Sequence, residues 1–292
     1  MITLSNGHKI NHVAASGALA FDGRGWFWEW PLVWLGSMQP QLFTVVLKSL
    51  TRYPRVGNLK MWKPLECIRP IRGGAVNKVG LTNPGIEYWC EKIAPTIDFE
   101  NNSIIGSIFG NKQELEEMAE MFNHFAFVAL EVNPSCPNSG DCLDTADTVI
   151  NMVKAVKAIS DHPIIVKVSV DQDYLAIAEG LVGIVEAISI NSVPWKTAFP
   201  NGEISPLWKL EERVGGGGGG VSGKPAQKLN WKAVGELSKQ GLIPVIAPSI
   251  MEFEDLEIVR NLGAQATSFG AIFLLTPWKS TSIVMRDTEN EY

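Results

Sequence analysis

Eight short apolar runs, rich in β-branched residues, alternate along this chain with segments of helical periodicity. Continuous apolar strands are typical of a parallel sheet that is covered on both faces. The pattern therefore predicts an α/β fold, a (β/α)₈ TIM barrel, with a doubly wound open sheet as the alternative. We favour the barrel because the strands number eight and unusual polar residues recur where they end. The predicted strands are His12–Ser16, Leu42–Lys48, Ser103–Ile108, Phe127–Asn133, Pro163–Ser169, Val185–Asn191, Ile243–Ala247 and Gln265–Gly270.

The segments between these strands are predicted to be helices that cover the barrel. Leu143–Ile159 carries an apolar stripe with spacings of three and four residues. Asn111 followed three residues later by Glu114 resembles a capping box at the start of another helix. The predicted helices are Pro84–Ile93, Asn111–His124, Leu143–Ile159, Tyr174–Gly180, Leu229–Lys239 and Phe253–Asn261.

Two insertions interrupt the alternation and are expected to form long loops at the C-terminal face of one barrel domain spanning residues 1–292. Residues 49–102 are rich in Pro, Arg and Gly, and residues 192–228 contain the glycine run Gly215–Gly220. Six consecutive glycines usually form a flexible linker. A domain boundary here would cut the barrel, so a loop whose backbone closely approaches a ligand is the alternative.

Charge and cysteine content narrow the class of protein. A net charge of −6 provides no broad basic surface for nucleic acid. The four cysteines form neither a CxxC pair nor a disulfide framework, and no secretory signal begins the chain, so we expect reduced thiols in the cytoplasm. The four histidines lie far in sequence from Cys136 and Cys142, so no metal site is expected.

The segment Gly25–Gly36 holds four of the ten tryptophans in twelve residues. It is too short for a membrane span, which needs about 20 apolar residues. We predict a buried helix or a subunit interface, because tryptophan frequently anchors interfaces. Contact with a membrane surface is the alternative.

Polar residues follow several of the predicted strands. Cys136 lies between two carboxamides, Asn133 and Asn138, at the end of the fourth strand. Lys167 lies within the apolar fifth strand, where an unpaired ammonium is costly, so it should face a ligand or a carboxylate. Because barrel strand ends converge at one face, these groups should meet there. The other members of the set are Lys48, Ser49, Asn77, Asn191 and Ser192.

Two lysines, several carboxamides and one thiol suggest a particular chemistry. Lysines can stabilise an anionic cofactor ring, amides can hold a planar substrate, and a thiolate can remove a proton. The sequence shows neither an acidic cluster for a catalytic divalent metal nor a serine–histidine pairing signature. A flavin enzyme that takes a proton and a hydride from a small planar substrate would use all these parts.

With these segments the chain resembles the dihydroorotate dehydrogenase family, specifically the soluble class whose catalytic base is cysteine. The Ser-Cys-Pro-Asn element at 135–138, with its flanking asparagines, is the most specific part of the resemblance. The resemblance implies a barrel with non-covalent FMN that oxidises dihydroorotate to orotate in de novo pyrimidine biosynthesis. The other segments are Ala15–Gly17, Lys48-Ser49, Arg55–Asn58, Asn77–Leu81 with Asn83, Val166–Val168, Asn191-Ser192 and Gly219–Gly223.

The resemblance also implies residue roles. Cys136 would remove the proton at C5 of dihydroorotate while hydride passes from C6 to N5 of the flavin. Lys167 would face the N1/O2 edge of the flavin and stabilise its negative charge, and Lys48 would serve both substrate and flavin. The implied substrate-binding residues are Lys48, Asn77, Asn133, Asn138, Asn191 and Ser192. The implied flavin-binding residues are Ala15, Ser16, Lys48, Ser49, Asn133, Lys167, Asn191, Gly220, Ser222, Gly223, Ser249, Gly270 and Ala271.

Three features depart from the family pattern. Pro248-Ser249 stands where the family usually has a glycine pair, and proline has no N–H for the FMN phosphate. Ser249 can compensate through its backbone or its hydroxyl. The insertion with Trp195-Lys196 and the tryptophan-rich segment are also atypical. The alternatives are a flavin oxidoreductase acting on another dihydropyrimidine or cyclic amide, and a phosphate-binding barrel without activity. Pyrimidine-reducing relatives commonly carry histidine where Asn138 stands.

The electron acceptor is open at this point. One expectation is a homodimer that uses fumarate or another small acceptor. A second is a catalytic subunit that passes electrons to a partner with FAD and an iron–sulfur cluster, since the four cysteines here cannot hold a cluster by their spacing. Quinone is a third acceptor, although it normally requires an N-terminal membrane-associating extension that is not seen here.

Overall fold

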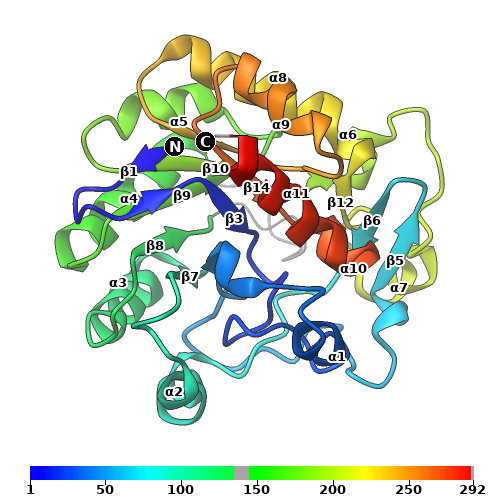
Figure 1. The fold of residues 1–292 in the computed structure, drawn as a ribbon, viewed down its shortest axis with the longest axis horizontal. Helices are drawn as coiled ribbons and strands as arrows, with labels where there is room; N and C mark the ends of the chain where they lie inside the picture. Colours follow the sequence, from blue (N-terminus) through cyan, green and yellow to red (C-terminus); the bar gives the residue numbers. More distant parts are fainter. Residues whose placement is uncertain (135–144, 291–292) are drawn as a thin grey trace.

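The centre of the molecule is a closed barrel of eight parallel strands (Figure 1). The computed structural model describes residues 1–134 and 145–290. Each barrel strand falls within a predicted strand, so the predicted (β/α)₈ TIM barrel is confirmed and the doubly wound alternative is wrong. The strands, in order around the barrel, are β3 (His12–Ala14), β4 (Thr44–Val46), β7 (Ile104–Ile108), β8 (Ala129–Val132), β9 (Ile164–Val168), β10 (Ala187–Ile190), β13 (Val245–Ala247) and β14 (Ala266–Phe269).

Successive side chains of a strand point in opposite directions, so every second residue of a barrel strand points into the barrel interior. These inward-pointing residues form an apolar layer and a polar layer. In β9, Ile165 belongs to the apolar cluster inside the barrel, whereas Ile164 and Val166 pack in the larger cluster with the helices. Lys167 follows Ile165 by two residues and therefore points inward, one layer nearer the strand ends. The same step leads from Ala129 to a buried Glu131 in β8. The strand ends therefore carry the polar layer of the interior.

Helices surround the barrel (Figure 1). The Asn111–Glu114 capping box is present at the start of α3, and α4 buries the predicted apolar stripe. The last long helix, α11, was not predicted. It contacts the barrel through Asp287, whose Oδ2 lies 3.0 Å from Nε2 of His12 in β3. The helices of the alternating units are α2 (Ile86–Tyr88), which continues as a π-helix over Trp89–Ile93, α3 (Lys112–Phe122), α4 (Ala146–Ile159), α5 (Tyr174–Gly180), α8 (Lys224–Gln240), α9 (Glu254–Asn261), α10 (Ala271–Leu275) and α11 (Pro277–Asn290).

The two insertions, expected to be loops, join in a small antiparallel sheet. Its strand order is β11-β12-β6-β5, so the two strands of the second insertion lie beside the two strands of the first, and β12 pairs with β6 where they meet. A separate hairpin at the N-terminus packs Ile2, Leu4 and Ile10 into the apolar interior cluster. The strands are β1 (Ile2–Thr3), β2 (Lys9–Ile10), β5 (Ile68–Ile71), β6 (Gly74–Asn77), β11 (Val193–Pro194) and β12 (Gly220–Gly223). Short helices are α1 (Trp30–Trp34), α6 (Trp195–Ala198), α7 (Trp208–Val214), and the 3₁₀ turns Pro40–Leu42, Pro64–Glu66 and Ala94–Thr96.

The glycine run is built into this insertion sheet. Gly215 to Gly219 all have positive φ, between +67° and +97°, a region that favours glycine. A Cβ at Gly218 would lie 2.8 Å from Cβ of Trp195, and one at Gly219 would lie 2.6 Å from the carbonyl oxygen of Asn77. The linker interpretation is therefore wrong. The backbone does make a close approach, but to Asn77 and Trp195 within the protein.

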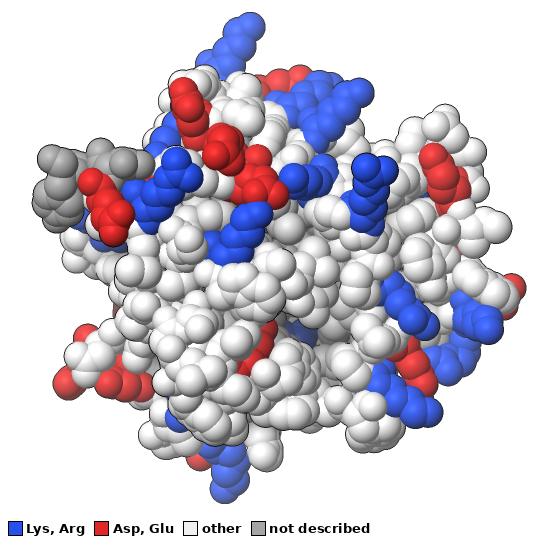
Figure 2. Space-filling view, turned by 45° about the vertical axis from the view of Figure 1, so that its right-hand side comes forward, with Lys and Arg blue, Asp and Glu red and all other residues white. Residues whose placement is uncertain are grey.

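The tryptophan-rich segment is not a buried helix, so that part of the prediction is wrong, and the subunit interface stays a prediction. Helix α1 has no buried residue, and the side chain of Trp34 is 78% exposed. Trp26 and Trp28 stack with ring centroids 5.2 Å apart. On the face shown in Figure 2, charged side chains of both signs surround an extended uncharged area. Among residues 1–134 and 145–290, no helix combines the length and apolar character needed to cross a bilayer.

Candidate active site

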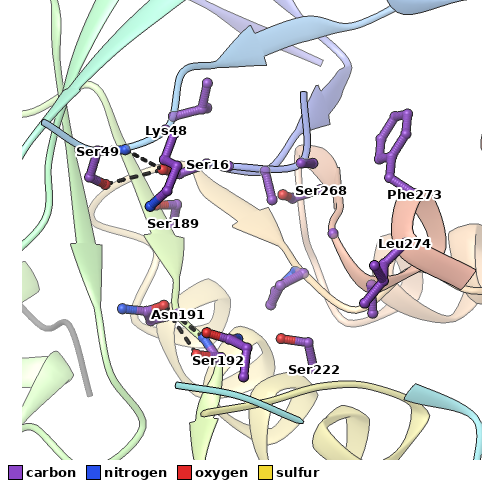
Figure 3. A pocket seen from close by; sticks show the side chains of 18 of the residues that line it. Ser16, Lys48, Ser49, Ser189, Asn191, Ser192, Ser222, Ser268, Phe273 and Leu274 are labelled. Atoms are coloured by element: carbon purple, nitrogen blue, oxygen red, sulfur yellow. Dashed lines mark hydrogen bonds between the residues drawn. The ribbon is translucent and has the colours of Figure 1, made fainter. Parts of the chain in front are cut away.

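A cavity of about 280 Å³ opens where the barrel strands end (Figure 3). Residues from seven barrel strands or the loops that follow them, and from β12, contribute to its wall. It brings together nearly all the predicted site residues that lie in the described part of the chain. These lining residues are Ala15, Ser16, Lys48, Ser49, Asn77, Asn133, Lys167, Asn191, Ser192, Ser222, Gly223, Ser249, Gly270 and Ala271.

Of the predicted site residues that the structure describes, Gly220 is not among those lining the cavity. Gly220 pairs with Asn77 across β12 and β6, and its carbonyl oxygen accepts a hydrogen bond from Nδ2 of Asn77 at 3.4 Å. Its contact is thus with a site residue. Cys136 and Asn138 lie outside the described residues, so their roles remain predictions.

Hydrogen bonds connect the strand-end side chains to one another. Nδ2 of Asn191 donates to Oδ1 of Asn133 at 3.4 Å, and Nδ2 of Asn133 donates to Oγ of Ser49 at 3.3 Å. Oγ of Ser49 lies 3.1 Å from Oγ of Ser16, and the Ser49 N–H also donates to that hydroxyl (Figure 3). Four strand ends are thereby joined. The two carboxamides are held in fixed orientations and still line the cavity.

Lys48 is held against the loop that follows the first barrel strand. Its side chain is largely buried, and Nζ lies 5.7 Å from the ring centroid of Phe21. The Lys48 N–H donates to the carbonyl of Ala20 at 2.9 Å. A Cβ at Gly17 would lie 3.6 Å from Cγ of Lys48. This lysine therefore extends along the cavity wall between the tryptophan-rich segment and the strand ends.

Lys167 forms a buried ion pair inside the barrel. Its Nζ lies 3.1 Å from Oε1 of Glu131, and the side chains are 9% and 3% exposed. Glu131 also accepts hydrogen bonds from Ser189 at 2.9 Å and Ser107 at 3.3 Å. The prediction that Lys167 faces a ligand or a carboxylate is confirmed. Glu131 was not predicted, although its position two residues before Asn133 in one strand places both on the same face.

Asn77 is fixed by the insertion sheet and by its neighbour Lys78. Lys78 is 3% exposed, and its Nζ donates to the carbonyl of Gly215 at the start of the glycine run. Burial lowers the pKa of Lys78. This contact ties the second insertion to β6, the strand that ends at Asn77.

The turn at Pro248-Ser249 keeps a backbone shape that usually requires glycine. Ser249 has φ of +69°, in the left-handed region. Helix α8 holds the turn from one face: Trp231 Nε1 donates to the Pro248 carbonyl, and Gln227 Nε2 donates to the Ser249 carbonyl, each at 3.0 Å. Asn230 Nδ2 donates to Ser249 Oγ at 3.1 Å. The side chains of α8 thus support a serine at this position.

Asn230 is a cavity residue that sequence reasoning missed. It is 1% exposed and lines the cavity, and its Oδ1 has no hydrogen-bond partner within the described residues. The predicted helix began only at Leu229, whereas α8 begins at Lys224. The i, i+3, i+4 spacing of Gln227, Asn230 and Trp231 is the signal that could have indicated a polar helix face at the site.

The tryptophan-rich segment supplies one wall of the cavity, through Trp26, Trp28 and Glu29. Trp26 Nε1 donates to the Gly17 carbonyl at 3.1 Å, and the Trp26 N–H donates to the Glu29 carboxylate at 2.8 Å. Burial raises the pKa of Glu29 to about 7. No ion pair to Glu29 occurs in the described part of the chain. The site thus contains two buried carboxyl groups, one with a lysine partner and one without.

Within residues 1–134 and 145–290, no group of three or more His, Cys, Asp or Glu side chains is arranged to hold a metal ion. Besides the carboxyl groups of Glu29 and Glu131, the described polar side chains that line the cavity carry mainly ammonium, carboxamide and hydroxyl groups. These are suited to an organic ligand with hydrogen-bonding edges and a negative charge.

Comparison with known proteins agrees with the resemblance. The family model described as dihydroorotate dehydrogenase matches residues 37–267. The catalytic subunit of dihydroorotate dehydrogenase B (NAD(+)) from Desulforamulus reducens is 30% identical over 256 residues, 84% of this chain and 80% of the relative. The corresponding Geobacillus kaustophilus subunit is 29% identical over 281 residues, 92% and 83% of the two chains. A putative dihydroorotate dehydrogenase A (fumarate) from Aeropyrum pernix is 29% identical over 240 residues, 78% and 74%. The chain therefore belongs to the dihydroorotate dehydrogenase family.

Proposed function

We propose that this protein is a flavoprotein oxidoreductase that uses FMN to oxidise dihydroorotate to orotate in de novo pyrimidine biosynthesis. The observation that carries the proposal is the convergence of Lys48, Asn77, Asn133, Lys167 and Asn191 on one cavity. They come from five separate parts of the sequence, in a chain that matches the family over residues 37–267.

Membership of the family supports a flavin-dependent enzyme, and the residues present fit such a group. Bound flavin would supply the two-electron acceptor for the reaction. The ammonium of Lys167 in the cavity wall suits a ring that gains negative charge on reduction. Trp26 and Trp28 offer an apolar wall for an aromatic ring system, and the unpaired Oδ1 of Asn230 can accept from a hydroxyl.

We assign the FMN phosphate to the ends of β12, β13 and β14, where Ser222, Gly223, Ser249, Gly270 and Ala271 line the cavity. The backbone at Gly223 has φ of +88°, and a Cβ there would lie 2.7 Å from the Gly73 carbonyl oxygen. Only glycine fits at such a position, which lets β12 pack closely against the backbone of Gly73 and Gly74 at this end of the cavity. The hydroxyl of Ser249 takes the place of the amide that Pro248 lacks.

Substrate binding is assigned to the fixed carboxamides. Asn133 and Asn191 present planar donor–acceptor pairs, and the Ser192 N–H donates to Oδ1 of Asn191 at 2.8 Å, which holds that amide. Lys48 would pair with the substrate carboxylate from the same wall. Cys136 is proposed as the base that removes the C5 proton, and Asn138 as a further substrate contact.

We further propose one FMN-binding domain over residues 1–292, which acts as a homodimer or as the catalytic subunit of a complex with an FAD and iron–sulfur electron-transfer partner. Two relatives above are named catalytic subunits of the NAD(+)-dependent enzyme, which supports the second arrangement. Cys67 and Cys90 are free thiols, which agrees with the cytoplasmic location we propose.

Anaerobic titration of the purified protein with L-dihydroorotate tests this function. Bleaching of the flavin absorbance is the expected result. A yellow protein that does not bleach would keep the flavin and direct attention to other dihydropyrimidines or cyclic amides. A protein that stays colourless after reconstitution with FMN would contradict the proposal.

A further inference from the structure

The polar layer of the barrel interior contains a glutamate that forms an ion pair with the lysine proposed to face the flavin. Glu131 accepts three interactions, from Lys167 Nζ at 3.1 Å, Ser189 Oγ at 2.9 Å and Ser107 Oγ at 3.3 Å. Both Glu131 and Lys167 line the cavity. A ligand in this cavity therefore meets a paired cation, whose field the neighbouring carboxylate weakens.

The carboxylate is also the end of a hydrogen-bond chain that reaches the substrate carboxamides. Ser107 Oγ lies 2.8 Å from Ser49 Oγ, and Ser49 Oγ accepts from Asn133 Nδ2 at 3.3 Å. Ser107 and Ser49 are 1% and 4% exposed. The position of Glu131, and with it that of the Lys167 ammonium, is thus set by a buried network that spans neighbouring strands.

We propose that Glu131 is a positioning residue that holds the Lys167 ammonium and limits how strongly it favours reduction of the bound flavin. This inference rests on the proposed function, because it requires a flavin at this wall of the cavity. Glu131 acts through Lys167. With both residues present, the added negative charge on the flavin meets a cation that is partly neutralised.

Removing either partner has a different consequence. Without the carboxylate, the ammonium acts on the flavin without the opposing charge of Glu131, and reduction becomes easier. Without the lysine, Glu131 has no ammonium to hold or to neutralise. Glu131 then no longer influences the flavin, so its removal should have little further effect.

The midpoint potential of the bound flavin tests this scheme. Glu131→Gln keeps the volume and a hydrogen-bonding side chain, and it should raise the equilibrium constant for two-electron reduction at least tenfold, about 30 mV. Lys167→Met should lower that constant. The double variant should match Lys167→Met within a factor of about three, about 14 mV. Ser189→Ala is the matched control, because it removes one donor to Glu131 and leaves the ion pair; it should change the constant by less than about threefold.

An unchanged potential in flavin-loaded Glu131→Gln would overturn the inference, and so would a tenfold difference between the double variant and Lys167→Met. If Glu131→Gln does not fold, the comparison between Lys167→Met and the double variant still decides.

Thermal unfolding of the flavin-free proteins adds a second readout: Lys167→Met should unfold at a lower temperature than the double variant, which lacks the unpaired carboxyl group. Equal unfolding temperatures would contradict the coupling. Wild-type protein that bleaches with dihydroorotate while Glu131→Gln shows no shift would refute this inference alone; wild-type protein that binds no flavin would refute both.

Discussion

The two ends of the cavity are built in different ways. At the ends of β4, β8, β9 and β10, the polar groups bond to one another: Lys167 to Glu131, and Asn191 to Asn133. Lys167, Asn191 and Asn133 are among the residues on which the family resemblance rests, whereas Glu131 is not. At the end of β13, Pro248-Ser249 departs from the expected family pattern, and Ser249 holds a left-handed backbone with support from α8.

The difference follows from what each end must supply. The first end supplies positive charge, from lysine, and fixed donor–acceptor pairs, from carboxamides. Few other side chains can supply either. The second end supplies mainly a backbone shape. Several side-chain arrangements can stabilise one shape, and here Gln227, Asn230 and Trp231 do so. Substitutions at the first end should therefore affect chemistry, and those at the second should affect cofactor retention and stability.

The largest expected effect is at Cys136, which follows β8 in the sequence. Cys136→Ser should retain FMN and slow flavin reduction by dihydroorotate by about 10²–10⁴, the usual contribution of a general base. Stopped-flow absorbance after anaerobic mixing measures this rate. A rate within twofold of wild type would remove the cysteine from the mechanism.

Asn191→Ala should have the next largest effect. It removes a substrate contact and frees Asn133, so kcat/KM for dihydroorotate should fall roughly tenfold to a hundredfold, as expected for one or two lost hydrogen bonds. Asn230→Ala is the matched control at the other end of the cavity and should instead weaken FMN retention. The same kinetic profile for both variants would break the distinction between the two ends.

Glu29 shows what a cavity carboxyl group does without a lysine partner. Its pKa of about 7 lies above the ordinary value of 4.5, because burial disfavours the charged form. The folded protein then keeps a proton that the unfolded chain loses, so stability falls as pH rises from about 4.5 to 7. Glu29→Gln has no carboxyl group to titrate and should not show this loss. Its free energy of unfolding minus that of wild type should therefore be roughly 3 kcal/mol larger at pH 8 than at pH 4.

Urea unfolding of wild type and Glu29→Gln at pH 4, 6 and 8 measures this difference. The gap between the two proteins should widen with pH and then level off. A gap that does not depend on pH would show that the carboxyl group of Glu29 ionises normally in the fold.

The smallest expected effects are at Ser249. Ser249→Ala keeps the strained backbone and loses the bond from Asn230, so it should destabilise the protein by about 1 kcal/mol. Ser249→Gly loses the same bond but relieves the left-handed conformation, which should offset most of that loss. Thermal unfolding compares them. If the alanine variant were the more stable of the two, the backbone at this turn would not be strained.

Local pattern was sufficient to predict the barrel strands and several helices. The apolar strand around Lys167 required a counter-charge, and the strand ends indicated where polar residues meet. Pattern was insufficient for the two insertions and for the start of α8. The partners Asn77 and Gly220 are 143 residues apart, and no periodicity within either segment indicates that they pair.

The tryptophan-rich segment was misjudged for a related reason. Its composition indicates burial, yet Trp30 and Trp34 are 41% and 78% exposed. Hydrophobic composition alone does not place a residue inside, because burial depends on a neighbouring surface to pack against. Trp26, by contrast, lines the cavity and donates to Gly17.

The sequence alone determined which residues alternate between the inside and the outside of the barrel, because side-chain direction repeats every two residues in a strand. It also determined that Lys167 is buried and needs a partner. Only the tertiary structure decided that the partner is Glu131, that Asn191 contacts Asn133 and that α8 supports Ser249. These pairings depend on strand register and on closure of the barrel. Both properties arise from contacts between distant segments, so neither is contained in any local stretch of the chain.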